Sequence, residues 1–202
     1  IFQDFLDILK DKRFLTYSLA GAITFSGLFL YLAGSSMIFI DDFAVSPKTY
    51  GWIFAIIASG MIMSSQANVL LLNRWTSRQL LWAGMIGQVI ISFVFFVLSL
   101  LMKVKIETTV FLFFLFMASF GITNPNTMSL TLAPFSRNAG RASALLGFMQ
   151  MAIGAVASSL VGAFNIVGLG TVVALLCCTS TMGLAILFAG RRLTLQGNET
   201  NL

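Results

Sequence analysis

The side chains best suited to binding a solute are neutral amides inside apolar stretches. Asn124, Asn126 and Gln150 are the main candidates. An unsatisfied amide in hydrocarbon is costly, so these groups should face another helix or a watery cavity. Interhelical hydrogen bonds would make them packing residues, worth about 0.6 kcal/mol each on average. A cavity would instead make them solute-recognition residues, and the sequence is compatible with both interpretations.

Titratable chemistry is scarce in this sequence. There is no histidine among the 202 residues, which removes His-based acid–base catalysis and His metal sites. Cys177 and Cys178 are neighbours in an apolar run and form neither a disulfide framework nor a metal pair. No charged residue falls in the middle of an apolar stretch, where a proton relay normally lies. We therefore expect no enzyme, no metal and no cofactor, and we expect any proton relay to lie elsewhere.

The composition is that of a membrane protein. Hydrophobic residues make up 58% of the chain and charged residues 9%, and the mean hydropathy is +0.94. A soluble domain is about 25% charged and could not hide so much apolar surface. The twelve Lys and Arg are scattered between apolar runs, which argues against a nucleic-acid-binding face.

Six stretches are long and apolar enough to cross a membrane as helices. They cover residues 14–40, 50–72, 80–102, 108–133, 141–164 and 169–190. Asn165 and Gly168 indicate a tight turn between the last two. The sequence thus predicts an all-α polytopic protein whose spans divide three plus three, as in the inverted repeats that build one half of a major facilitator transporter.

Basic residues predict the orientation of these spans. Three of them, Lys48, Lys103 and Lys105, fall on one side. The other nine fall on the opposite side: Lys10, Lys12, Arg13, Arg74, Arg78, Arg137, Arg141, Arg191 and Arg192. We therefore expect both ends to be cytoplasmic in an integral membrane protein that is surrounded by membrane lipids.

The two ends of the chain differ from the spans. Residues 1–13 read as an amphipathic helix on the membrane surface, with Phe2, Phe5, Leu6 and Leu9 at helical spacing; a solvated linker helix is the alternative. Residues 191–202 read as a polar cytoplasmic tail without a helical stripe. Because the chain opens on Ile1 without a signal peptide, we expect it to begin inside a longer protein.

A proline and an aromatic stripe add to the solute-cavity hypothesis. Pro125 lies beside Asn124 and Asn126 and should kink the fourth span, as either a moving or a static feature. Phe25 and Phe29, with Tyr31 nearby, could line an apolar drug pocket. A stripe that faces the core or the lipid is the competing explanation.

Small residues mark one face of the fifth span. Gly154, Ser158 and Gly162 recur every four residues, with Gly147 two turns before the run. Such a small-xxx-small face lets another helix approach closely. We predict that these four residues pack against a neighbouring helix.

One segment of about thirty residues resembles a known family. It contains Pro125-Asn126, the break Ala133-Pro134-Phe135, the start Ala139-Gly140 and the run ASALLGFMQ that ends at Gln150. The segment is similar to the one that joins the fourth and fifth spans of the C-terminal half in major facilitator drug:proton antiporters of the bicyclomycin-resistance (Bcr/CflA) type. The loop with Arg74 and Arg78 resembles the superfamily's gating loop, although its usual Gly and Asp are missing, and both arginines could simply follow the positive-inside rule.

The resemblance implies a transporter that exports small amphipathic solutes or drugs in exchange for protons by alternating access. This half would supply one wall of the solute cavity, and an N-terminal six-helix half would supply the proton-handling residues. A self-contained six-span scaffold or channel is the alternative function, favoured by the lack of a charged relay.

Overall fold

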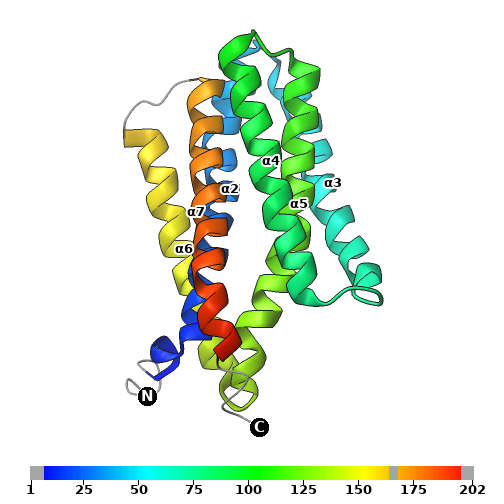
Figure 1. Ribbon diagram of the computed structural model, residues 1–202. Helices are drawn as coiled ribbons and strands as arrows, with labels where there is room; N and C mark the ends of the chain where they lie inside the picture. The colour runs from blue at the N-terminus through cyan, green and yellow to red at the C-terminus, as the bar shows by residue number, and fades with distance from the viewer. Residues whose placement is uncertain (1–6, 164–167, 197–202) are drawn as a thin grey trace.

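The computed structural model describes residues 7–163 and 168–196, and this part of the chain is helical without strands. Six helices in it are long and apolar enough to cross a membrane. They are α2 (Lys12–Ser36), α3 (Pro47–Leu71), α4 (Ser77–Leu101), α5 (Ile106–Leu132), α6 (Ala139–Ala163) and α7 (Leu169–Gln196) (Figure 1). The predicted all-α membrane fold with six spans is confirmed.

Polar side chains cap the N-terminal ends of three of the spans. Asp11 accepts a hydrogen bond from the amide of Phe14 at 2.7 Å, and Ser46 caps α3 with Pro47 in its first turn. Thr76 and Gln79 form a reciprocal capping box on α4. Each cap satisfies backbone N–H groups that have no partner within the helix. The sharp starts of these spans therefore follow from local sequence.

Three helices continue beyond the predicted span ends. α2 runs on as a π-helical segment over Met37–Asp42, and α5 runs on as a 3-10 segment over Ala133–Asn138. α7 extends to Gln196, so the start of the predicted polar tail is helical, since no glycine or proline interrupts residues 191–196. The rest of that tail, and Asn165 in the predicted turn, lie outside the described residues.

The spans form two triplets along the chain, α2–α4 and α5–α7, and the first helix of each triplet packs on two helices of the other. α2 packs on α6 and α7, and α5 packs in the same way on α3 and α4, while α2 contacts α5 and α4 contacts α7 (Figure 1). Exchanging α2 with α5, α3 with α6 and α4 with α7 reproduces this pattern. Because each triplet has an odd number of spans, the two cross the membrane in opposite directions, as inverted repeats do.

The helix packing places four helices in an arc, in the order α3, α5, α2, α6, with α4 and α7 behind the central pair. α2 and α5 are accordingly the most buried spans. The start of α2 and the end of α7 lie at the same end of the bundle (Figure 1). Arg74, Arg78, Arg141 and Arg191 belong to helix ends on that side, which we call the basic end, and the three lysines of the minority set lie at the opposite end.

The short segment before α2 packs against the helix bundle. Residues 1–6 of the predicted surface helix lie outside the described residues, and residues 7–10 form a helical turn. Ile8 in this turn is buried against Phe14 and Ala142, while Lys10 and Asp7 form an exposed ion pair at 3.4 Å. The apolar side of the described turn therefore docks on the bundle next to the start of α6.

Close approach of α3 and α5 depends on glycine. A methyl group at Gly121 would meet the carbonyl oxygen of Met61 and Oγ of Ser64, and one at Gly60 would lie 2.9 Å from the carbonyl oxygen of Phe114. Backbone atoms cannot swing aside as the end of a side chain can. The spacing of these two helices thus requires hydrogen at both positions.

Gly121→Ala should destabilise the bundle by about 1–3 kcal/mol, the usual cost of overpacking. We expect a lower thermal unfolding midpoint of the detergent-solubilised protein. Gly147→Ala is the matched control, because no atom of the described residues lies within 4 Å of the added methyl and alanine favours the helix by up to about 1 kcal/mol. Equal unfolding midpoints for the two variants would contradict the glycine requirement.

Candidate functional site

A groove of about 290 Å³ lies between α3 and α5. Its wall on α3 consists of Met61, Ile62, Ser65 and Gln66, and its wall on α5 consists of Phe120, Gly121, Asn124 and Pro125. We call it the α3–α5 groove. It combines apolar surface with a few hydroxyl and amide groups, a composition typical of sites for small amphipathic ligands.

Two of the predicted recognition residues meet beside this groove. Nε2 of Gln150, on α6, donates to Oδ1 of Asn124 at 3.4 Å, which is long for a hydrogen bond. Gln150 is 6% exposed, and Asn124 is half-buried on the groove wall. The amide nitrogen of Asn124 makes no hydrogen bond to any residue that the structure describes. The pair therefore has both a donor and a weakly held acceptor available for a polar ligand.

Aromatic rings extend the site toward α2 and α6. The ring of Phe25 lies 5.6 Å from that of Phe120 and 5.7 Å from that of Phe29, between centroids. Phe29 in turn packs on Gly154, where a methyl group would lie 2.6 Å from its Cδ2 atom. The predicted stripe thus connects the groove on α5 with the glycine-bearing face of α6.

Asn126 faces a different way from Asn124. It is 1% exposed, and its Nδ2 atom donates to Oδ1 of Asn68 at 2.6 Å and to the carbonyl oxygen of Ile122 at 2.8 Å. The second bond lies next to Pro125, which lacks the N–H needed to bond the carbonyl of Gly121. Asn126 therefore joins α5 to α3 and supports the helix at its proline, outside the groove lining.

Other predicted site residues are also separate from the groove. Tyr31 is 3% exposed and packs between Phe54 and Phe113, with ring centroids at 6.0 and 5.1 Å. Gly147 and Gly162 have no described atom within 4 Å of an added methyl, and Ser158 is half-buried. Of the three glycines on the predicted packing face, Gly154 lies against a described neighbour, Phe29 of α2.

The two predicted loop arginines lie at the basic end. Arg74 is exposed in the turn before α4, and Arg78 is half-buried in the first turn of that helix. Neither arginine is among the described residues that line the α3–α5 groove.

Phe120 is a groove residue that the sequence analysis did not single out. It joins the groove to Phe25, and it precedes Asn124 by four residues, which places both on one helix face. That spacing was the signal that could have identified it. Phe runs are so frequent in this chain, with 20 Phe in all, that the spacing alone did not distinguish a cavity residue from a lipid-facing one.

Two curated proteins are similar to this chain. It is 28% identical over 160 residues to an uncharacterized MFS-type transporter, YdgK, of Bacillus subtilis, covering 77% of this chain and 38% of that protein. It is 25% identical over 165 residues to a bicyclomycin resistance protein homolog of Haemophilus influenzae, covering 82% of this chain and 41% of that protein. The chain thus spans about two fifths of the length of these relatives. No family model matches it.

Asn68 and Asn126 should stabilise the protein as a coupled pair. Replacing either with Ala leaves a buried amide without its partner, whereas replacing both removes the unsatisfied group. We expect a double-mutant cycle of unfolding free energies in mixed micelles to give a coupling of about 0.6–1.7 kcal/mol. Additive effects of Asn68→Ala and Asn126→Ala would show that the 2.6 Å contact contributes nothing to stability.

Proposed function

We propose that this membrane protein, a relative of major facilitator transporters of the bicyclomycin-resistance type, supplies one wall of the solute cavity of a proton-coupled exporter. Both relatives are named for transport or drug resistance, which confirms the resemblance based on the segment around Pro125 and Gln150. The function of a transporter follows from these relatives at the coarse level. Export, proton exchange and alternating access are our proposal.

The observation that carries the proposal is the Asn124–Gln150 pair beside an aromatic cluster. The pair brings amide chemistry from α5 and α6 together, and Phe25 and Phe120 provide apolar surface from α2 and α5. Phe25 and Gln150 lie near the midpoints of their helices, the depth at which transporters of this architecture bind solutes. A small amphipathic solute would find both kinds of contact at this one place.

The charge distribution supports an orientation with both termini in the cytoplasm. The basic end holds the start of α2 and the end of α7, and cytoplasmic loops of membrane proteins carry an excess of Lys and Arg. We accordingly propose that the protein resides in a bacterial inner membrane with its basic end inside.

Proton coupling requires a titratable group within the membrane. The middle parts of the six spans carry no Asp, Glu, Lys, Arg or His. The relatives extend well beyond the matched region, so we place the coupling residue in a second, N-terminal six-helix half. Solute recognition and proton binding would then reside in different halves, linked by alternating access.

Asn124→Ala and Gln150→Ala should each lower solute export about fivefold while expression stays unchanged, since a net hydrogen bond is worth about 1 kcal/mol. Bicyclomycin resistance and efflux of a fluorescent amphipathic cation, in cells that make the intact protein, would measure this. Thr181→Ala is the matched control, because it removes an exposed hydroxyl on α7 that bonds only its own helix.

Unchanged export in both amide variants would show that Asn124 and Gln150 pack the helices and do not recognise the solute. Export that persists after the proton gradient is collapsed would refute proton coupling. An intact protein that moves no solute in either assay would favour the scaffold alternative.

A further inference from the structure

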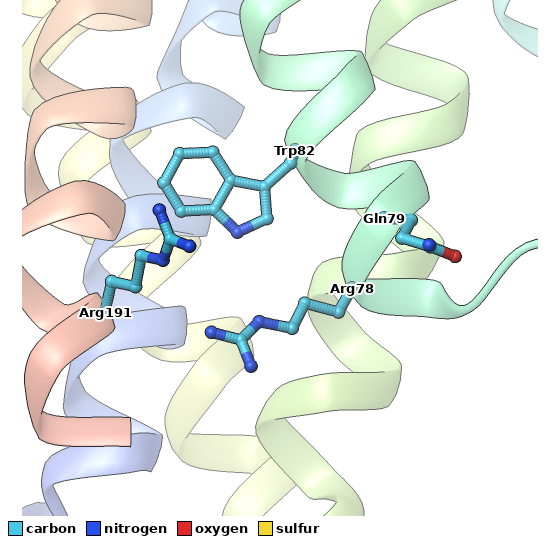
Figure 2. A pocket seen from close by; sticks show the side chains of 4 residues that line it. All are labelled: Arg78, Gln79, Trp82 and Arg191. Atoms are coloured by element: carbon cyan, nitrogen blue, oxygen red, sulfur yellow. The ribbon is translucent and has the colours of Figure 1, made fainter. Parts of the chain in front are cut away.

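A second pocket, of about 430 Å³, lies at the basic end between the first turns of α4 and the last turns of α7. Arg78, Gln79, Trp82 and Arg191 line it. Figure 2 shows both arginine side chains extending from opposite helices into the same space beside the ring of Trp82, while Gln79 is turned away. We call it the basic pocket, and the α3–α5 groove shares none of its residues.

The chemistry of the basic pocket selects an anion. Both arginine side chains carry a positive guanidinium group, and none of the four lining residues that the structure describes is a carboxylate. Two cationic groups that line one space attract an anion into it. Guanidinium groups also match the oxygen atoms of a phosphate in pairs, which a halide ion cannot exploit.

The surroundings of the basic pocket indicate a lipid. The outer faces of α4 and α7 above it expose large apolar side chains: Ile86, Ile90, Phe93, Met182 and Phe188. Phe188 is 64% exposed and contacts Trp82 edge-to-face, with ring centroids 6.3 Å apart. Trp is typical of the headgroup level of a bilayer. The pocket thus lies where an acyl chain could follow an apolar helix face and its headgroup could reach two arginines.

The fold itself does not impose this charge. The repeat symmetry relates the basic pocket to another at the opposite end, where the end of α4 meets the start of α7. That pocket, of about 630 Å³, is lined by both Asp42 and Lys103 among other residues, so its charges balance. The pair of arginines is therefore a property of the sequence at one end only.

From these observations we infer that the basic pocket binds the phosphate headgroup of an anionic phospholipid. Arg78 and Arg191 would contact the phosphate oxygens, Trp82 would lie at the headgroup boundary, and the acyl chains would follow α4 and α7. Such basic pockets between membrane helices are known to recognise acidic headgroups. This site is independent of solute transport through the groove.

Fluorescence of Trp82 tests the inference in the intact protein. In a Trp52→Phe/Trp75→Phe background, Trp82 is the remaining Trp of this chain; any further Trp in the intact protein is likewise replaced by Phe. In phosphatidylcholine vesicles, brominated phosphatidylglycerol should quench it at a several-fold lower mole fraction than brominated phosphatidylcholine. Arg78→Gln and Arg191→Gln should each reduce that preference about fivefold, given the usual contribution of one basic residue near an anionic surface.

Three controls separate the possible outcomes. Arg78→Lys/Arg191→Lys keeps the charge and should keep most of the preference, which guards against misfolding as a cause. Lys103→Gln, at the opposite pocket, should leave it unchanged. Equal quenching by the two lipids, or a preference that survives Arg78→Gln/Arg191→Gln, overturns the inference. Loss of quenching on adding inorganic phosphate, but not chloride at equal ionic strength, also overturns it by assigning the pocket to a soluble phosphate.

Discussion

The absence of water inside a bilayer is the constraint on which this structure depends, because every polar group within a span needs a partner in the protein. Hydroxyl groups can satisfy this requirement within their own helix. Thr24 and Thr127, for example, donate to the carbonyl oxygens four residues earlier, at 2.8 and 2.9 Å. Amides carry a donor and an acceptor, so some reach across to other helices. Asn126 crosses to α3, and Gln150 crosses from α6 to α5. Among the hydroxyls, those of Ser35 and Tyr50 also link two helices, α2 and α3, at 2.8 Å, and the two amide contacts add further polar links between spans.

The two amide contacts differ in a way that separates architecture from recognition. The Asn126–Asn68 contact is short and buried, beside a proline and a close glycine approach that together hold α5 on α3. The Gln150–Asn124 contact is longer and borders an open groove. A short, fully buried bond gives rigidity, whereas a long, partly buried bond beside a groove can exchange partners. Asn124 and Asn126, two residues apart on α5, thus serve different purposes: Asn126 holds two helices together, and Asn124 borders the groove.

Much of the fold was predictable, because the bilayer and the surrounding water determine which segments span the membrane and on which side the basic residues lie. Neither property depends on which helices pack together. The six spans and the segregation of Arg74 and Arg191 from Lys103 follow directly from the sequence. The direction in which a polar side chain faces was harder to predict, since it depends on which helix lies opposite. Asn124 and Asn126 are two residues apart and face different neighbours. Gln88 is fully buried, and its amide has no partner among the described residues, an arrangement that no sequence pattern indicated.

The interlocking of the triplets has a consequence for biosynthesis. Of the six described spans α2 is synthesised first, whereas α6 and α7, on which it packs, are synthesised last. Until these two helices are made, the surface of α2 that they cover stays without them. Thr16, Thr24 and Ser26 on that helix each bond a carbonyl of α2 itself, so they need no other helix to be satisfied. Hydroxyls bonded to their own helix thus allow α2 to be stable before α6 and α7 are present, and tight packing on glycines can follow once those two helices are inserted.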